Sequence, residues 1–547
     1  MKLRIWNGSA RMVRRKVNVR SPKSNVQRGK IVLARRYDVD VKDCPGNNHM
    51  KKSSLLLAGL ILSVLTFAFG TNHGFNDVFG PLFHPASNVH PLVGPQHGLD
   101  SLHRWNVIAL NATGLDHTPV APGENRVFGE QLGPGRSSRA MAIVHIAMFD
   151  ALDAVVGGYT SYTGTQAAHG PMSVDAAISQ AARDTLAALF PSQTATFDAY
   201  LAQDLAAVRN SQQRANGIDL GQRAAAALLA MRLNDGSQIP EPRVGVDYFP
   251  SNLPGHWRQD PVSLIPLALG AHWGECIPFV VTSPSQFRAP PPPDMTSSDY
   301  TTAYNEVKSL GGDGVITPTQ RTDEQTFIGI FWAYDGTPSL CAPPRLYNQI
   351  TVQIADQRRM SAIQFARLLA LVNVGMADAG MTIWESKYHY DLWRPIAGIR
   401  ESDPGTGPTG LGDGNPDTIG DPNFSPLGAP ASNLNGPNFT PPFPAYPSGH
   451  AGFGGAIFEM MRRFYGTDNI AFTFVSDEFN GQTRDHNGNV RPYRPRTFST
   501  LSQAEEENGQ SRIYLGIHWA FDKTEGIALG RRVADYVFDH ALTPTRP

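Results

Sequence analysis

Apolar residues recur at helical spacing along most of the chain, and no stretch shows a sustained alternation of apolar and polar positions. In 137–158 (SSRAMAIVHIAMFDALDAVVGG) they cover one broad face, and Gly157 and Gly158 end the pattern. The same spacing predicts further helices at 174–190, 193–209, 213–234, 321–335, 343–358, 361–393, 449–465 and 499–540. Because no internal repeat is visible either, the pattern predicts an all-α protein.

Stretches rich in proline and glycine divide this helical pattern. A break from about 237 to 297, which includes Pro290–Pro293, connects an N-terminal helical half (137–297, break included) to a C-terminal half (298–547). We therefore expect two helical bundles. Residues 71–136 are rich in Gly, Pro, His and Asn and are expected to form an irregular wrapping segment. In 404–447, 19 of 44 residues are Gly or Pro, which predicts a long loop that covers a site.

The N-terminal part of the chain has a different composition. Residues 1–49 are a basic extension with 13 Lys and Arg against 3 Asp, and Met50-Lys51-Lys52 then precedes the apolar run 55–69. We expect Met50 to be the true start and 50–70 to be a signal peptide cleaved near Gly70, which predicts export to the periplasm or medium. A basic cytoplasmic tail before an N-terminal membrane anchor is the alternative interpretation. No other stretch reaches the ~18 apolar residues that a membrane span needs.

The charge balance changes once this head is set aside. Residues 1–70, with Lys51 and Lys52 included, contain 15 of the chain's 47 Lys and Arg and 3 of its 48 Asp and Glu. Residues 71–547 therefore have 32 Lys and Arg against 45 Asp and Glu, a net charge of −13. An acidic body argues against nucleic acid as a partner. The two cysteines beyond the signal, Cys276 and Cys341, allow either one disulfide or two buried thiols and are too few for a structural zinc site.

Three short segments in the C-terminal half carry the candidate chemistry: KYHYDLWRP (387–395), PSGH (447–450) and SRIYLGIHWAFD (511–522). Lys387 and Arg394 are seven residues apart, which predicts that they share one face of a helix. The pair Pro447-Ser448 is a helix-start signal, and the free N–H groups of a first turn can bind an anion.

The third segment adds a histidine with its own carboxylate. His518 and Asp522 are four residues apart, so Asp522 can accept one imidazole N–H and leave the other nitrogen as a ligand or nucleophile. Each pattern alone has a plainer interpretation: a solvated basic face for Lys387 and Arg394, a simple helix start for PSGH, a core histidine for His518. Together they predict a pocket for a tetrahedral oxyanion.

The three segments resemble the signatures of the superfamily of type 2 phosphatidic acid phosphatases and vanadium-dependent haloperoxidases. Lys-x6-Arg-Pro, Pro-Ser-Gly-His and Ser-Arg-x5-His-x3-Asp are complete and in the same order. The segments 327–336 (FIGIFWAYDG), 343–350 (PPRLYNQI), 377–387 (ADAGMTIWESK) and 441–451 (PPFPAYPSGHA) are similar to the vanadium chloroperoxidase branch. The resemblance covers 320–540 well and 71–315 loosely.

The resemblance implies a role for each matched residue. His518 would be the metal ligand that binds vanadium, and His450 would be the acid–base group. Asp335 would pair with the active-site cations, and Asp522 would orient His518. Trp384 and Phe443 match the aromatic residues on the halide side of the site. The residues that would hold the vanadate oxygens are Lys387, Arg394, Ser448, Gly449 and Arg512.

The implied activity is vanadate-dependent oxidation of chloride or bromide by hydrogen peroxide to a hypohalous-acid equivalent, which halogenates an organic acceptor. Lys387 would also polarise the bound peroxide. The implied cofactor is vanadate, with no haem or flavin. The alternative is a soluble secreted acid phosphatase that uses His518 as a phosphohistidine nucleophile, because phosphate and vanadate are both tetrahedral anions. The oligomeric state is left open.

A calcium site is not expected. Asp413, Asn415, Asp417 and Asp421 have the early spacing of a calcium-binding loop, but Thr418 and Phe424 replace its usual Gly and Glu. Turns rich in Asp, Asn and Gly are the commoner explanation.

Overall fold

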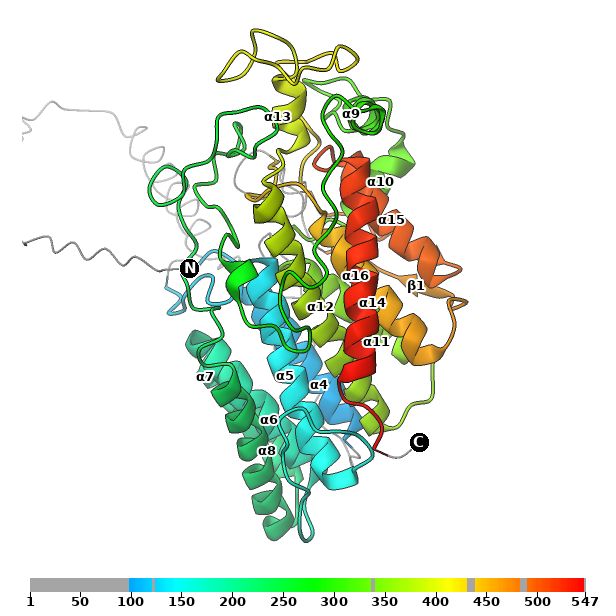
Figure 1. Cartoon of the computed structure of the whole chain (residues 1–547). Helices are drawn as coiled ribbons and strands as arrows, with labels where there is room; N and C mark the ends of the chain where they lie inside the picture. Colours follow the sequence, from blue (N-terminus) through cyan, green and yellow to red (C-terminus); the bar gives the residue numbers. More distant parts are fainter. Residues whose placement is uncertain (1–97, 121–122, 336–339, 430–437, 483–488, 546–547) are drawn as a thin grey trace, which may run out of the picture. The chain divides into compact units, whose positions relative to one another are not determined.

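Thirteen α-helices account for nearly all of the regular secondary structure that the computed structural model describes (Figure 1). The described residues are 98–120, 123–335, 340–429, 438–482 and 489–545. They belong to one unit that extends from His73 to the C-terminus. The predictions for 1–97, namely the basic extension, the signal peptide or anchor and the first part of the wrapping segment, lie outside the described residues.

The helices fall into an N-terminal and a C-terminal group. The N-terminal helices are α4 (Leu99–Asp116), α5 (Gly133–Val156), α6 (Val174–Leu189), α7 (Thr194–Ala207) and α8 (Ser211–Met231). The C-terminal helices are α9 (Ser298–Leu310), α10 (Asp323–Phe331), α11 (Pro343–Ala355), α12 (Ala362–Tyr390), α13 (Pro395–Arg400), α14 (Gly449–Tyr465), α15 (Leu501–Tyr514) and α16 (Ala520–His540). Short 3-10 turns are η2 (Pro191–Gln193), η3 (Trp273–Glu275) and η4 (Asp477–Phe479).

Two strands of three residues each, β1 (Phe472–Phe474) and β2 (Arg496–Phe498), form an antiparallel pair in which Phe472 lies opposite Phe498. The prediction of an all-α protein is therefore confirmed.

Helix α12 is the central element of the C-terminal group. It begins at a capping box, in which the Ser361 hydroxyl accepts the N–H of Gln364 and the Gln364 side chain accepts the N–H of Ser361. It ends at Asp391, which has a left-handed conformation with φ 51°. An 18-residue window of this helix has a mean hydropathy of 1.3, enough by composition to cross a membrane, yet 83% of that window is buried inside the protein. Its apolar length is explained by burial in the core.

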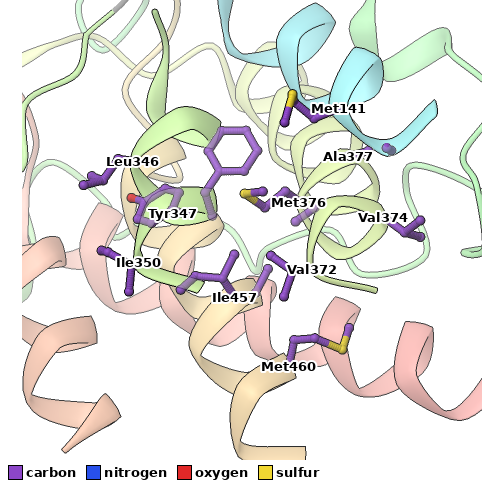
Figure 2. Close-up of a cluster of buried hydrophobic side chains, with 14 of the residues drawn as sticks. Met141, Leu346, Tyr347, Ile350, Val372, Val374, Met376, Ala377, Ile457 and Met460 are labelled. Atoms are coloured by element: carbon purple, nitrogen blue, oxygen red, sulfur yellow. The ribbon is translucent and has the colours of Figure 1, made fainter. Parts of the chain in front are cut away.

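The core lies where α12 meets its neighbours, as Figure 2 shows. Met141 comes from α5, Ile350 from α11, Met376 from α12 and Ile457 from α14, and all four are buried. Helix α5 also packs against α6 and α8, so it links the N-terminal helices to α12. Both predicted halves of the chain therefore contribute side chains to one hydrophobic cluster.

Helices α14 and α16 lie side by side and cross with almost no space between their backbones (Figure 1). A Cβ on Gly530 would lie 2.0 Å from the Gly452 carbonyl oxygen, and one on Gly455 would lie 2.5 Å from that of Ile527. A Cβ on Gly526 would lie 2.7 Å from the Ser448 oxygen. Only glycine fits such a crossing. The crossing brings the start of α14, with PSGH, against the start of α16, with Asp522.

One predicted irregular segment contains a helix. Within 71–136, residues 99–116 form α4, so the prediction was wrong there. Leu102, Trp105 and Ala109 have helical spacing and are buried, but the prediction rested on the Gly, Pro, His and Asn content of the whole segment, which suggested an irregular surface. The polar Arg104 between them is buried too, and its Nε donates to Asp204 Oδ1 at 2.8 Å. Buried ion pairs of this kind have no signature in an apolar pattern.

Two predicted helices differ from the observed ones: one ends early and the other is divided. The stretch 361–393 ends as α12 at Tyr390, and 499–540 is α15 and α16 with a turn at 515–519 between them. Gly516 in that turn has φ 72°, and a Cβ there would lie 2.4 Å from the Gly311 oxygen. The turn therefore packs against the end of α9, a helix that the pattern did not predict.

Candidate active site

The structure brings all of the sequence-predicted site residues to one region, although not on the elements we expected. Lys387 lies in the last turn of α12, but Arg394 is the residue that precedes α13, so the two do not share a helix face. Arg512 ends α15, and His518 lies in the turn before α16. Ser448 is the N-cap of α14, as PSGH predicted. The convergence is produced by helix ends and turns.

Lys387 is completely buried. Its Nζ donates to the carbonyl oxygens of Pro444 at 2.9 Å and Ala445 at 2.8 Å. An ammonium has three N–H donors, so one is left for another acceptor. Burial, with the neighbouring Arg394 cation, lowers the pKa of Lys387 well below its usual value. An anion in the site would reverse that effect.

Arg394 is held by backbone oxygens. Its Nε donates to Phe443 O and its Nη1 to Ile517 O, both at 2.9 Å. Within the described chain its Nη2 is buried and has no hydrogen-bond partner. Burial lowers the pKa of Arg394 to about 9.

Arg512 forms an ion pair with Asp335. Its Nη2 donates to Asp335 Oδ1 at 2.5 Å, and both side chains are buried. The Nε and Nη1 of Arg512 are buried without a partner among the described residues. Burial raises the pKa of Asp335, while Arg512 opposes the rise. Asp335 thus orients Arg512 through Nη2, while Nε and Nη1 remain available to bind an anion.

His518 is held in a single tautomer by Asp522. The imidazole Nδ1–H donates to Asp522 Oδ2 at 2.7 Å, and the same oxygen accepts the Trp519 N–H at 3.0 Å. Nε2 is left with its lone pair, which accepts from Arg394 Nη1 at 2.9 Å. Burial, helped by the nearby cations, lowers the pKa of His518, so the ring is neutral and able to act as a ligand. Burial also raises the pKa of Asp522 to about 7.

The start of α14 supplies backbone donors and a second histidine. The Ser448 hydroxyl caps the helix by accepting the Ala451 N–H, and Gly449 is the first helical residue. His450 follows; its Nε2 donates to the Ala333 oxygen and lies 3.8 Å from Asp335 Oδ1. Burial lowers the pKa of His450, and Arg512 adds to the effect. Its backbone oxygen accepts from Tyr347 Oη at 2.8 Å and from Asn508 Nδ2 at 2.9 Å.

Trp384 and Phe443 form an aromatic wall beside the cations. Their ring centroids are 4.9 Å apart, and Lys387 Nζ lies 5.7 Å from the Trp384 ring and 5.2 Å from the Phe443 ring. A Cβ on Gly449 would lie 3.3 Å from the Trp384 ring. Both aromatic residues line a cavity of about 380 Å³ that also contacts Gly449, His450, Arg512 and His518.

The sequence indicated two of the groups that position these side chains, Asp335 and Asp522, and did not reveal the others. The carbonyl oxygens that hold Lys387, Arg394 and His450 belong to residues of no special type, and backbone acceptors leave no mark in a sequence. Tyr347 was noted only for its place in a matched segment. Asn508 lies four residues before Arg512, one helical turn away, which could have suggested a shared face.

The donor set fits vanadate. Arg394 and Arg512, with their unpartnered N–H groups, and Lys387, with its third donor, all act electrostatically on His518. The unprotonated Nε2 of His518 accepts from Arg394 Nη1. Several cationic donors around one neutral imidazole suit a metal oxyanion that takes one nitrogen ligand. The same donors fit phosphate.

The two remaining predictions concern groups outside this site. In the candidate calcium loop, Asp413 Oδ1 accepts the Asn415 N–H at 2.9 Å and Oδ2 accepts the Thr418 hydroxyl at 2.7 Å. Its oxygens are occupied by turn hydrogen bonds. Cys276 and Cys341 are both free and buried, which decides between the two interpretations of the cysteines.

Comparisons with known proteins agree with this geometry. The family model for the second helical-bundle domain of vanadium chloroperoxidase (VCPO) matches residues 367–546. The vanadium chloroperoxidase of Curvularia inaequalis is 32% identical over 502 residues, covering 76% of this chain and 78% of that protein.

Two crystal structures share the fold. A bacterial vanadium-dependent iodoperoxidase superposes with a TM-score of 0.62 at 21% identity, covering 83% of this chain and 100% of that one. An apo-type bacterial vanadium-dependent chloroperoxidase has a TM-score of 0.54 at 17% identity, covering 76% and 96%. With the Curvularia relative, the matched bundle domain and the complete oxyanion site, this chain belongs to the vanadium chloroperoxidase family of haloperoxidases, which are oxidoreductases.

Proposed function

We propose that this protein binds vanadate and uses hydrogen peroxide to oxidise chloride or bromide to a hypohalous-acid equivalent that halogenates an organic acceptor. One observation carries the proposal: buried arginines with unpartnered N–H donors lie beside a neutral histidine whose Nε2 is unprotonated. A phosphate ester would satisfy the cations, but membership of the haloperoxidase family favours vanadate.

Each residue has a role in this proposal. His518 is the ligand through Nε2, and Asp522 keeps that nitrogen unprotonated by accepting the Nδ1–H. Lys387, Arg394 and Arg512 hold the anionic oxygens, with Ser448 and the Gly449 N–H. When bound, vanadate supplies a Lewis acid that makes an oxygen of hydrogen peroxide electrophilic toward halide.

His450 and Asp335 manage protons and orientation. The lowered pKa of His450 keeps its ring neutral, so with vanadate bound the ring could accept a proton from hydrogen peroxide and later donate it. Asp335 fixes Arg512 on the side away from its free donors.

The halide side of the site is the aromatic wall of Trp384 and Phe443. Lys387 lies beside this wall and can attract a halide anion, and chloride is the halide that we propose on the strength of Phe443. We also propose that the protein is exported after cleavage near Gly70, because Met50-Lys51-Lys52 and the run 55–69 have signal-peptide character. Terminal sequencing of the protein recovered from the medium or periplasm tests this, and an intact N-terminus there contradicts it.

The function is tested by loading the purified protein with orthovanadate. Bromination and chlorination of a dione reporter are then followed with hydrogen peroxide, and an aliquot without vanadate receives an aryl phosphate. Halogenation that needs both vanadate and peroxide is the expected result. Release of phosphate that vanadate inhibits, without halogenation, would make the protein a phosphatase.

A further inference from the structure

The cavity that reaches the cationic site continues into a region with different chemistry. The cations and histidines occupy one part of it, and the rest of the wall is formed largely by apolar side chains. These apolar residues include Phe128, Leu132, Ile265, Leu267, Phe439 and Phe453. Halide and peroxide are small and polar, so a wall of this kind is not needed for either of them.

The apolar surface continues to the solvent at the same segments. Phe128 lines the cavity and is 45% exposed, its neighbour Val127 is 58% exposed, and Leu264, next to Ile265, is 60% exposed. Exposed large apolar side chains clustered at a cavity mark a binding surface for apolar molecules.

Specific hydrogen bonds hold this wall against the catalytic residues. The Leu269 oxygen accepts both Trp384 Nε1–H and Tyr388 Oη–H at 3.0 Å, and the Leu269 N–H donates to Pro442 O at 2.9 Å. Asp260 Oδ2 accepts the Thr440 N–H at 2.6 Å, which ties the 260–269 segment to the segment that carries Phe439. The cavity is therefore pre-formed.

Among the described residues that line the cavity away from the cationic site and its histidines, the polar side chains are His117 and Ser263, with no Asp, Glu, Lys or Arg. Both ring nitrogens of His117 are already hydrogen-bonded, Nδ1 to the Thr113 oxygen and Nε2 to the Gly133 N–H, each at 2.9 Å. Ser263 lines the cavity, and its hydroxyl is buried without a hydrogen-bond partner in the part of the chain that the structure describes. The charged side chains that line the cavity, Asp335 and Arg512, belong to the cationic site and form an ion pair there. Since a charged ligand on an apolar wall would lose its hydration without compensation, the wall suits an uncharged molecule with one hydroxyl.

We propose that this cavity binds the organic acceptor, and that the acceptor is an uncharged, electron-rich aromatic molecule of the phenol class. The proposal rests on the proposed function. In the step it implies, hydrogen peroxide, halide, one proton and the aryl C–H become the aryl halide and two waters. The two electrons removed from the halide and the C–H bond reduce the peroxide O–O bond. Halogen transfer then occurs inside the protein to a bound molecule, so the enzyme distinguishes acceptors that free hypohalous acid does not.

The test compares two probes with the same reacting carbon. β-Naphthol is neutral, and a β-naphthol monosulfonate with its sulfonate on the other ring is charged. Both compete for bromination by the vanadate-loaded full chain, and in parallel by reagent hypobromous acid. We expect the enzyme to favour β-naphthol over the sulfonate by about tenfold or more relative to the reagent. Equal ratios would overturn the proposal, because they mean that hypobromous acid is released before it reacts.

Two variants test whether the apolar wall causes the preference for β-naphthol. Ile265→Asp places a carboxylate on the wall and should bring the ratio close to that of the reagent. Val315→Asp, at a position 89% exposed and away from the cavity lining, is the matched control and should keep the wild-type ratio. A ratio unaffected by Ile265→Asp in a folded variant would contradict the assignment.

Binding without turnover separates this inference from the proposed function. Fluorescence titration of the protein with β-naphthol, in the absence of peroxide, should saturate, and Ser263→Ala should weaken that binding several-fold while leaving naphthalene binding unchanged. Halide-dependent peroxide consumption without any acceptor reports the proposed function alone. If that consumption is absent while β-naphthol binds, the proposed function fails and the cavity assignment stands. If consumption is present and β-naphthol does not bind, only the inference fails.

Discussion

Three cations are buried within one pocket and are only partly neutralised. Lys387 and Arg394 are satisfied by backbone oxygens, which supply partial charges, and Asp335 is committed to Arg512. Burying like charges together costs free energy that protein dipoles offset incompletely. The lowered pKa values of Lys387 and Arg394 express that cost, and a bound oxyanion would remove it.

The two histidines should respond differently to removal. His518→Ala deletes the proposed vanadate ligand and is expected to lose vanadate binding and halogenation together. His450→Ala leaves the cradle intact and should keep measurable vanadate affinity but lose most of the turnover number, by 10²-fold or more at the scale of general acid–base catalysis. Calorimetric titration measures the vanadate affinity of each variant, and a bromination assay measures its turnover. Wild-type halogenation by His518→Ala would refute the ligand assignment.

A pH dependence is expected from a histidine outside the site. Burial lowers the pKa of His145 to about 4 from the value of 6.5 that it has when unfolded. As the pH falls, His145 is protonated in the unfolded chain before it is protonated in the folded one. The stability that the neutral ring contributes is therefore present above pH 6.5 and is lost as the pH falls below that value. The loss is about 2 kcal/mol at pH 5. Urea unfolding at pH 7.5 and pH 5 measures it, and His145→Gln should reduce the difference by that amount. An unchanged difference in the variant would exclude His145 as the cause.

At the scale of elements, the site depends on how closely α14 and α16 approach. Their glycines let the Ser448 N–H donate to the Asp522 backbone oxygen at 2.9 Å, which joins the two catalytic segments directly. Small residues at a helix crossing thus set a catalytic distance as well as a packing distance.

Gly530→Ala should weaken both the packing of α14 against α16 and the binding site at their crossing. The added methyl would lie 2.0 Å from the Gly452 oxygen, within the backbone, so the helices must separate. We expect a loss of about 2 kcal/mol or more in the free energy of unfolding and a parallel fall in vanadate affinity. Gly466→Ala is the control for a glycine with no neighbour within 4 Å, although its φ of 69° adds local strain. Equal vanadate affinity in wild type and Gly530→Ala would show that the crossing does not set the site.

Whether a helix could be predicted depends on whether residues nearby in the sequence or residues far from it stabilise the helix. Helices with an apolar face and a side-chain cap, such as α12 with its Ser361–Gln364 box, follow from local sequence. Helix α4 does not, because its interior contains Arg104, which is stabilised by Asp204 a hundred residues later. Arg394 and His518 were placed on helices because spacing alone cannot reveal a left-handed Asp391 or the turn at Gly516. The motifs named residues that the structure brings to one region, because their side chains, and not their secondary structure, define the motifs.

At the scale of the whole molecule, the cradle is assembled from elements that are far apart in the sequence. Asp335 follows α10, Lys387 ends α12, Ser448 starts α14 and Arg512 ends α15. Helix α5 supports α12 from the N-terminal group. A ligand that contacts several of these elements at once binds only the folded chain, so its binding must stabilise the fold.

Vanadate should therefore raise the free energy of unfolding by mass action. At 100 times its dissociation constant the expected gain is about 2.7 kcal/mol, and each further tenfold increase adds about 1.4 kcal/mol. Phosphate should stabilise through the same cations, but more weakly at equal concentration, because only vanadate would also bind the His518 nitrogen. His518→Ala should abolish the advantage of vanadate over phosphate while leaving the phosphate effect. Urea titrations with each anion, and with chloride at equal ionic strength as control, measure this. Equal stabilisation by vanadate and phosphate in the wild type would mean that His518 makes no bond to vanadium.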